Sequence, residues 1–195
     1  MNDLLFIRHA ETDMTGTFCG QSDPPVNDAG HRQIQELAER LRTKPIVTLF
    51  TSDLQRSVTT ARALADSLAI PCISRPALRE IDFGKWEGLT WEEIEKLDLT
   101  FATQWLEAFP HLTPPDGESF EIFEARVMAE TSYLLSQSKS SLIAVVTHAG
   151  VMRAVLRTLC GLDEKTTWTL TKPQCCTFRY AHHPHPDRRL QEVLG

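Results

Sequence analysis

The chain has 195 residues, of which 42% are hydrophobic and 24% charged, and its formal net charge is -6. These values are ordinary for a soluble globular protein, and the length predicts one domain over residues 1–195 with a sizeable core. The acidic balance argues against nucleic acid as a partner, because such domains usually present a basic stripe. No apolar run has membrane-spanning length, residues 1–3 lack a basic signal-peptide start, and the five cysteines show no C-x-x-C spacing. We therefore expect a cytoplasmic protein with reduced thiols and no membrane partner.

Three short apolar runs, each followed by a helical pattern, predict the core of the fold. The runs are Leu4–Ile7, Ile46–Phe50 and Leu142–Val146, and the last is apolar throughout, as in a strand buried on both faces. The apolar faces of the three following helices contain Ile34, Leu37, Ala38 and Leu41, then Val58, Ala61, Ala65 and Leu68, then Val151, Val155 and Leu159. This alternation predicts a three-layer α/β fold, with a mainly parallel sheet and helices on both faces.

The ends of these helices are marked by local signals. Ser52-Asp53-Leu54-Gln55 fits a capping box, with Ser52 capping the second helix and Gln55 reaching back. Gly161 is expected to end the third helix. Towards the end of the chain, Cys175–Tyr180 and Leu190–Leu194 are predicted to be edge strands.

Between about Gly88 and Ser138 the pattern changes to consecutive helices. A short helix is predicted over Trp91–Leu97, a second carries Phe101, Trp105 and Phe109 at helical spacing, and a Pro-rich loop follows from Pro110 to Gly117. A longer helix then presents Phe120, Phe123, Val127 and Leu134 on one face. We interpret residues 88–117 as a small helical cap insertion packed over one end of the sheet.

Cationic and imidazole side chains follow each of the three predicted strands. Arg8 and His9 follow the first strand, Arg56 follows the second, and His148 follows the third. Because the carboxyl ends of parallel strands meet at one edge of the sheet, these four side chains should converge there. Histidine can attack phosphorus and arginine can hold phosphoryl oxygens, so this edge predicts phosphate chemistry. Glu80 is the candidate acid for protonating a leaving oxygen, with Asp82 as its rival.

The order of these motifs resembles that of the histidine phosphatase superfamily, the phosphoglycerate-mutase-like fold. The matching segments are Leu4 to Thr12, Phe18-Cys19-Gly20, Asn27 to Gly30, Ser52 to Arg56, Glu80 to Gly88, Pro115 to Ser119 and Thr147 to Gly150. The resemblance implies that His9 becomes phosphorylated, that Arg8, Arg56 and His148 hold the phosphoryl oxygens, and that Glu80 acts as acid and base. It also places Thr15, Cys19, Gly20 and Ala149 around the substrate. No metal or other cofactor is implied.

The sequence departs from the family pattern in two ways. Ala10 and Ala149 stand where glycine is common, which should narrow the pocket if their φ angles are negative. Ile81 and Gly150 stand where mutases tend to carry Arg and Asn. The departures favour a phosphomonoester hydrolase acting on a small phosphorylated metabolite. The segment Glu80 to Gly88 is most similar to α-ribazole phosphatases of cobalamin synthesis, so α-ribazole 5′-phosphate is the predicted substrate.

Alternative functions and residue roles stay open at this point. The protein could be a broad sugar or nucleotide phosphatase, a phosphoglycerate mutase, or a non-catalytic protein that binds phosphorylated ligands. Arg56 could be a solvated helix residue, and Glu80 could pair with Arg79. The stripe of Phe101, Trp105 and Phe109 could form core packing or stack on a substrate base. The histidines at 182, 183 and 185 are interpreted as a solvated turn rather than a metal site.

Overall fold

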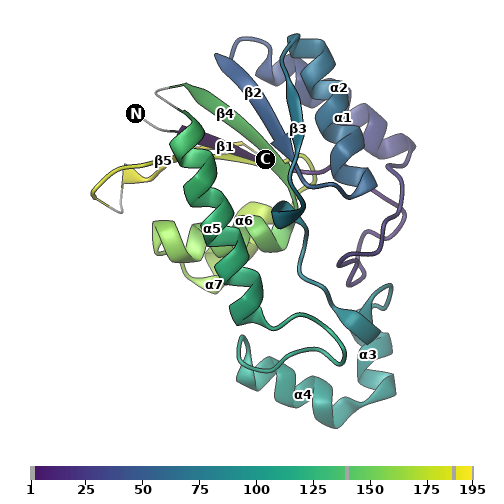
Figure 1. Ribbon diagram of the computed structural model, residues 1–195. Helices are drawn as coiled ribbons and strands as arrows, with labels where there is room; N and C mark the ends of the chain where they lie inside the picture. Colours follow the sequence, from purple (N-terminus) through teal and green to yellow (C-terminus); the bar gives the residue numbers. More distant parts are fainter. Residues whose placement is uncertain (1–2, 139–140, 186–187, 195) are drawn as a thin grey trace.

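A computed structural model describes residues 3–138, 141–185 and 188–194, and it has the predicted α/β architecture (Figure 1). The three predicted strands are β1 (Asp3–Arg8), β2 (Ile46–Thr51) and β4 (Leu142–Thr147). They are followed respectively by α1 (Asp28–Leu41), α2 (Gln55–Leu68) and α6 (Ala149–Cys160). Each strand extends one residue beyond its predicted carboxyl end.

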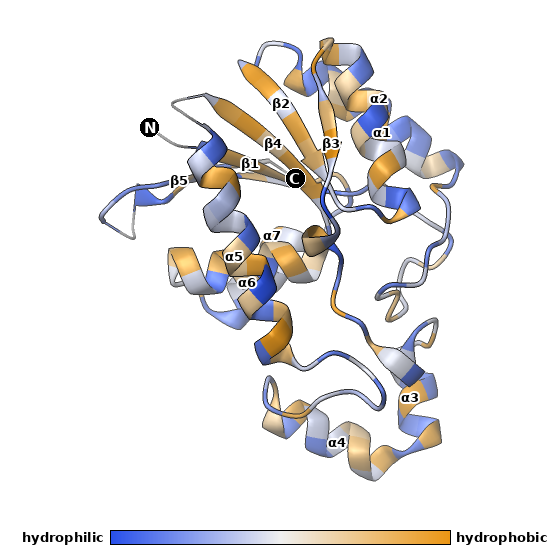
Figure 2. Ribbon diagram, viewed as in Figure 1, coloured by the Kyte–Doolittle hydropathy of each residue, from blue (hydrophilic) through white to orange (hydrophobic). Residues whose placement is uncertain are grey.

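One mixed sheet carries the fold, in the order β3-β2-β4-β1-β5-β6. The four strands β3 (Cys72–Ser74), β2, β4 and β1 are parallel, and β5 (Thr177–Ala181) and β6 (Leu190–Leu194) are antiparallel to their neighbours. The central strand β4 is buried along its whole length between β1 and β2. Hydrophobic residues dominate these inner strands in Figure 2.

Alternating residues of the strands divide the core into two layers. Leu5 and Ile7 pack with the apolar faces of α1 and α2, whereas Leu4 and Phe6 pack with α5 (Phe120–Ser138) and α6. Successive side chains of a strand point to opposite faces, so the same four-residue run supplies both layers. The predicted three-layer arrangement is therefore confirmed.

The predicted helices between residues 88 and 117 are α3 (Trp91–Leu97) and α4 (Leu99–Ala108). They lie beyond the carboxyl end of the sheet, away from the two helical layers (Figure 1). Thr90 forms a full capping box with Glu93 at the start of α3, and Asp98 caps α4. The buried residues here, Trp86, Ile94 and Ala102, form a separate aromatic-rich cluster that we call the cap cluster.

Three local predictions are wrong. The capping box at Ser52 does not form, because α2 begins at Gln55 and the carboxylate of Asp23 accepts the Gln55 N–H at 2.5 Å instead. The strand predicted over Cys175–Tyr180 begins at Thr177, and it lies between β1 and β6 rather than at an edge. Cys175 has a φ of 54°, which is incompatible with an extended strand. The edge prediction is confirmed for Leu190–Leu194.

One strand and one α-helix of the described residues had no counterpart in the sequence prediction, and neither did the short 3-10 helices Pro76–Leu78 and Gly84–Trp86. The short strand β3 has only three residues, too few to show a period. Helix α7 (Glu164–Thr171) is capped by Asp163 and has few apolar residues. Its C-terminal carbonyl groups nevertheless bond to a site residue.

Candidate active site

A cavity of about 680 Å³ opens at the carboxyl end of the parallel strands. One end is lined by Glu80 and by residues at or just after the carboxyl ends of β1 and β2, including Arg8, His9 and Arg56. The other end is lined by aromatic residues, several of them from the cap. The predicted convergence at the sheet edge is therefore observed, and the cavity is of the size that a small ligand needs.

His9 is buried, and its ring is fixed in one tautomer. Its Nδ1 lies 2.7 Å from the carbonyl oxygen of Ala10, which can only accept, so Nδ1 carries the proton. The other nitrogen, Nε2, accepts a 3.2 Å hydrogen bond from Nε of Arg56. Burial, together with the nearby Arg56 and Arg8 charges, holds the pKa of His9 well below its usual value. His9 is thus a neutral imidazole whose unprotonated Nε2 carries the electron pair that a nucleophile requires, and the hydrogen bond from Arg56 holds that nitrogen in place.

Arg56 is fully buried, so it is not the solvated helix residue of the alternative interpretation. Besides His9, its guanidinium donates to the carbonyl oxygens of Gly20 and Ser22 at 2.7 and 2.6 Å. No carboxylate pairs with Arg56 within the described parts of the chain. A buried cation held only by neutral groups is well suited to an anionic ligand, because its charge is not cancelled.

Glu87 fixes the loop whose carbonyl groups accept the hydrogen bonds of Arg56. The sequence prediction missed this role. Its carboxylate accepts from the backbone N–H groups of Gln21 and Ser22, both at 2.6 Å, and from the Ser22 hydroxyl at 2.5 Å. A Cβ at Gly20 would come within 2.1 Å of Glu87 Oε1, and Gly20 has a φ of 50°, so glycine is required there. The only sequence signal was the position of Glu87 in the segment Glu80 to Gly88.

Arg8 and His148 flank His9 and have unsatisfied polar atoms. Arg8 donates through Nη1 to the carbonyl oxygens of Thr171, at 3.0 Å, and Lys172 at the end of α7. A 2.7 Å hydrogen bond joins His148 Nε2 to the hydroxyl of Ser52, which is why Ser52 does not cap α2. Arg8 Nε and His148 Nδ1 are buried without a partner among the described residues.

The imidazole of His148 is fully buried, and the ring centroids of His9 and His148 are 5.1 Å apart. Burial is the main reason that the pKa of His148 lies well below its usual value, and Arg56 contributes. His148 does not itself line the cavity. Buried polar groups are nearly always hydrogen-bonded. The unpaired Nδ1 of His148 and the unpaired Nε of Arg8 depart from this rule, which indicates that a ligand binds nearby.

Glu80 lines the cavity and is held against the N-terminus of α6. Its Oε2 accepts from the Gly150 N–H at 2.9 Å, and its Oε1 accepts from its neighbour Ile81 at 3.0 Å. A Cβ at Gly150 would come to 2.1 Å from Glu80 Oε1, so any larger residue would displace the carboxylate. Arg79 pairs with Asp53, so it is not the partner of Glu80. Asp82, the alternative candidate for the acid, accepts a hydrogen bond from the Gly84 N–H at 2.8 Å and does not line the cavity.

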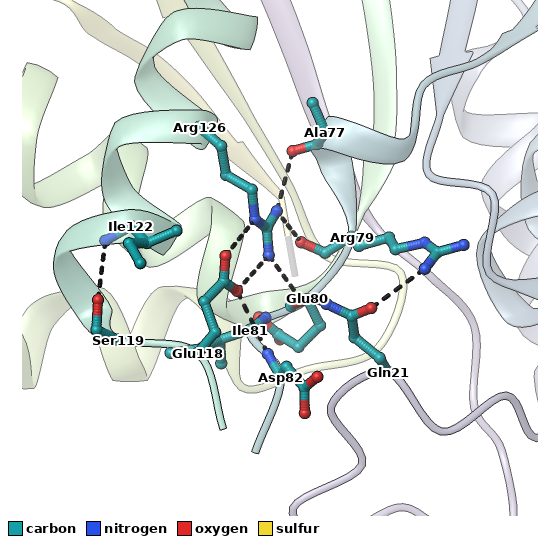
Figure 3. Close-up of polar contacts among 10 residues, drawn as sticks. All are labelled: Gln21, Ala77, Arg79, Glu80, Ile81, Asp82, Glu118, Ser119, Ile122 and Arg126. Carbon is teal, nitrogen blue, oxygen red and sulfur yellow. Dashed lines mark hydrogen bonds and ion pairs between the residues drawn. The ribbon is translucent and has the colours of Figure 1, made fainter. Parts of the chain in front are cut away.

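The segment that carries Glu80 is anchored to α5 by one arginine (Figure 3). Arg126 pairs with Glu118 through two hydrogen bonds of 2.7 Å. The same guanidinium donates to the carbonyl oxygens of Ala77, Arg79 and Glu80 at 3.0, 2.7 and 2.9 Å. Arg126 thereby fixes the backbone on both sides of Arg79. The sequence prediction missed this pair, because Glu118 lies in the loop before α5 and Arg126 lies within the helix.

The remaining predicted substrate residues all line the cavity. Thr15 is exposed there, Cys19 and Gly20 lie beside Arg56, and Ala149 is nearly buried. Burial raises the pKa of the Cys19 thiol, so the thiol stays protonated. Neither Ala10 nor Ala149 has a positive φ, so alanine is accommodated at both positions without backbone strain.

Aromatic side chains form the opposite wall of the cavity, which we call the aromatic wall. It contains Phe18, Trp91, Trp105, Phe109 and Phe120. Trp105 has ring contacts to Phe18 at 6.2 Å and to Phe109 at 5.3 Å, and its indole Nε1 is buried with no partner among the described residues. Phe101, by contrast, packs on Trp86 within the cap cluster and does not line the cavity.

The described residues contain no group of three or more His, Cys, Asp or Glu side chains placed to hold a metal ion. In the same part of the chain, no helix is long and apolar enough to cross a membrane.

The fold and the site together define an α/β domain with a cavity at the carboxyl end of its parallel strands, and a buried histidine lines that cavity between two arginines. The sequence model of the histidine phosphatase superfamily (branch 1) matches residues 4–191, and the chain belongs to this family. The predicted family is thus confirmed.

The chain is also similar to individual proteins, of which we compare two curated relatives and two solved structures. A bifunctional protein of Mycobacterium tuberculosis is 33% identical over 79% of this chain, which spans only 43% of that protein's length. The adenosylcobalamin/α-ribazole phosphatase of Escherichia coli is 29% identical, over 89% of this chain and 86% of its own length. The structure of a putative α-ribazole-5′-P phosphatase from E. coli matches with a TM-score of 0.85 and 27% identity, covering 98% and 95% of the chains. A phosphoglycerate mutase structure from Thermus thermophilus matches with a TM-score of 0.73 and 31% identity, covering 99% and 98%.

Proposed function

We propose that the protein is a phosphomonoester hydrolase that acts through a phosphohistidine intermediate. The observation that carries this proposal is the arrangement around His9, a neutral imidazole flanked by Arg56 and by two unpaired buried groups, Arg8 Nε and His148 Nδ1. A phosphoryl group bound at His9 would lie beside the Arg8 guanidinium, which lines the cavity, and near the ring of His148, whose centroid is 5.1 Å from that of His9. The family and the phosphatase names of several relatives support the same activity.

The first half-reaction transfers the phosphoryl group to His9. Nε2 of His9 forms the new P–N bond in line with the breaking P–O bond, while Arg8, Arg56 and His148 hold the phosphoryl oxygens. Glu80, in its protonated form, donates its proton to the leaving oxygen, and the alcohol departs. Glu80 is left as a carboxylate that accepts the N–H of Gly150.

The second half-reaction returns the enzyme to its starting state. The Glu80 carboxylate takes a proton from a water molecule, and the water oxygen attacks phosphorus as the P–N bond breaks. Inorganic phosphate leaves, His9 regains its free electron pair at Nε2, and Glu80 is protonated again. A protein that only binds phosphorylated ligands would have no use for an acid placed beside the leaving group.

Hydrolysis is favoured over mutase activity by residues 81 and 150. Ile81 is nearly buried and offers no charge to a second acidic group. An asparagine at position 150 would collide with Glu80, because even a Cβ would come to 2.1 Å from its Oε1. The position that mutases tend to give to Asn is therefore occupied here by the carboxylate itself.

The substrate that we propose to test first is α-ribazole 5′-phosphate. Its aromatic base would lie against Trp105 and Phe109, and the unpaired Trp105 Nε1 could donate to a polar atom of that substrate. A broad sugar or nucleotide phosphatase is the second candidate, since sugars and bases could use the same wall. We further propose that residues 1–195 act as one domain with a cap at 88–117, in the cytoplasm, without a cofactor or nucleic-acid partner.

Trapping of the intermediate tests the proposed chemistry. Brief incubation with a phosphorylated substrate and rapid quench should give an acid-labile, base-stable phosphoenzyme in the wild type and none in His9→Ala. The reaction should proceed equally after dialysis against EDTA. Labelling at a residue other than His9, or full activity of His9→Ala, would overturn the mechanism.

Comparison of substrates tests the finer proposal. Phosphate release would be measured as kcat/KM from α-ribazole 5′-phosphate, ribose 5-phosphate, nucleotides and 3-phosphoglycerate. We expect the first to be preferred. Interconversion of phosphoglycerates faster than their hydrolysis would contradict the hydrolase proposal, and a flat profile would remove α-ribazole 5′-phosphate as the preferred substrate.

A further inference from the structure

One loop, residues 20–23, holds Arg56 at two points. The carbonyl oxygens of Gly20 and Ser22 accept from its terminal nitrogens at 2.7 and 2.6 Å. The carboxylate of Asp23 accepts, at 2.5 Å, from the first N–H of the helix that carries Arg56. The guanidinium and the backbone beside it therefore keep their positions only if this loop keeps its shape.

A single peptide group of the loop connects Arg56 to Glu87. The carbonyl oxygen of Gly20 accepts from Arg56. The N–H of the same peptide group belongs to Gln21, and it donates to Glu87 Oε1 at 2.6 Å. The other carboxylate oxygen accepts from the backbone N–H and the hydroxyl of Ser22 at 2.6 and 2.5 Å. Because hydrogen bonds in a chain polarise one another, the charge of Glu87 strengthens the acceptor that Arg56 uses.

Glu87 does not itself line the cavity. Within the described residues its hydrogen bonds come from backbone N–H groups and one hydroxyl, and none comes from a lysine or arginine. A Cβ at Gly20 would come within 2.1 Å of the carboxylate, so the loop and Glu87 lie in close contact. The carboxylate is therefore placed to align Arg56 without occupying the place of an anionic ligand.

We infer that Glu87 is a positioning residue for phosphoryl transfer, which acts by aligning the guanidinium of Arg56. The inference rests on the proposed hydrolase function and adds to it a residue outside the cavity. Arg56 holds the transferred phosphoryl group rather than the leaving alcohol, so loss of Glu87 lowers kcat by the same factor for every substrate. A misplacement of about 1 Å in a group that holds the reacting atoms can cost on the order of 10²-fold in rate.

A double-mutant cycle tests whether Glu87 acts through Arg56. The variants are Glu87→Gln, which keeps the shape of the side chain but removes its charge, Arg56→Lys, and the two together. The measurements are kcat and KM for p-nitrophenyl phosphate and ribose 5-phosphate. We expect Glu87→Gln alone to lower kcat roughly 10- to 100-fold for both substrates, with a smaller change in KM. In the Arg56→Lys background the same change should cost less than about 3-fold, because lysine cannot reach both carbonyl oxygens.

Two further variants separate positioning from a general loss of structure. Glu87→Asp keeps the charge on a shorter side chain and should restore part of kcat. Urea unfolding shows whether each variant is folded, and Glu87→Asp takes the place of Glu87→Gln in the cycle if the latter is unfolded. Glu93→Gln is the matched control, because Glu93 likewise accepts from a backbone N–H and a hydroxyl, those of Thr90, but is exposed and lies outside the cavity. It should leave kcat near the wild-type value for both substrates.

An equal factor of loss in the wild-type and Arg56→Lys backgrounds would overturn the inference, because Glu87 would then act independently of Arg56. An unchanged kcat in Glu87→Gln would overturn it as well. A failure of the hydrolase proposal would show separately, as no phosphate release by the wild type. In that event calorimetry with inorganic phosphate tests the alignment of Arg56 by itself. The dissociation constant should rise about 10-fold in Glu87→Gln and stay constant in Glu93→Gln, and equal values in the wild type and Glu87→Gln would contradict the inference.

Discussion

The two ends of the cavity are built in different ways. At the phosphate end, Arg56 and His148 are buried and Arg8 is partly buried, and all three lie at or just after the ends of strands. Backbone carbonyl groups fix the two arginines, and the Ser52 hydroxyl fixes His148. At the leaving-group end, three residues of the aromatic wall, Trp91, Trp105 and Phe109, come from α3, α4 and the C-cap of α4, and these helices lie beyond the carboxyl end of the sheet (Figure 1). We therefore expect the residues at the end of the sheet to determine which bond is broken, and the cap to determine which molecule fits. The predictions below separate these two contributions.

Loss of the proposed acid should have the largest effect at the phosphate end. Glu80→Gln cannot donate a proton, so hydrolysis of alkyl phosphates should fall roughly 10²- to 10⁴-fold, while p-nitrophenyl phosphate, whose leaving group needs no proton, should fall much less. The measurement is kcat for both substrates.

Asp82→Asn is the matched control, because Asp82 accepts from Gly84 and does not line the cavity. It should leave both rates near the wild-type values. An equal reduction of both substrates in Glu80→Gln would exclude Glu80 as the acid.

The role proposed for Arg56 should depend on the shape of its guanidinium group as well as on its charge. Arg56→Lys keeps the charge but cannot reach His9, Gly20 and Ser22 together, so kcat should fall about 10²-fold or more for every substrate, whatever its leaving group. Arg62→Lys, an exposed position on the same helix, is the control. Near-wild-type kcat in Arg56→Lys would remove Arg56 from the site.

The buried histidines should make the phosphate end the acid-sensitive part of the molecule. The pKa values of His9 and His148 are lowered in the folded state, so below about pH 6.5 the unfolded chain binds more protons than the folded one. The free energy of unfolding should then decrease as the pH falls, by about 1.4 kcal/mol per pH unit for each histidine.

Urea unfolding at pH 7.5, 6.5 and 5.5 measures this dependence. His148→Asn should make the slope shallower by the contribution of one histidine. An unchanged slope in that variant would show that His148 titrates alike in the folded and unfolded states.

The cap should affect selectivity rather than chemistry. Trp105→Phe keeps the aromatic wall but removes the unpaired indole N–H, and we expect kcat/KM for a substrate with an aromatic base to fall about 10-fold, with ribose 5-phosphate nearly unaffected. Phe101→Leu, which alters the cap cluster without touching the cavity, is the control. If Trp105→Phe lowered kcat/KM equally for both substrates, the cap would not be the part of the molecule that determines selectivity.

The sequence predicted the parts of the molecule that have a strong local period. The runs from Leu4, Ile46 and Leu142 are apolar and short, and the side chains that follow them meet because parallel strands share one carboxyl edge. For the same reason the amino-acid sequence alone was enough to place His9, Arg8 and Arg56 together. The helix Trp91–Leu97 has the bounds that the sequence predicted.

What the sequence could not predict depends on contacts between distant residues. Arg126 anchors the Glu80 segment from 46 residues away, and Glu87 reaches back 66 residues to Gln21. Asp23 replaces the predicted Ser52 cap because Ser52 is engaged by His148. No local pattern encodes these pairings, because each requires the completed fold to bring its partners together.

The position of Glu87 has a practical consequence for redesigning the protein. Trp86, which is buried in the cap cluster, and Glu87, which holds the loop under Arg56, are adjacent in the chain. A chimera that exchanges the cap for that of another family member should therefore join the donor segment after Gly88 and return before Gly117, where Glu118 pairs with Arg126. Junctions placed earlier would exchange Glu87, which supports the loop that binds Arg56, together with the cap.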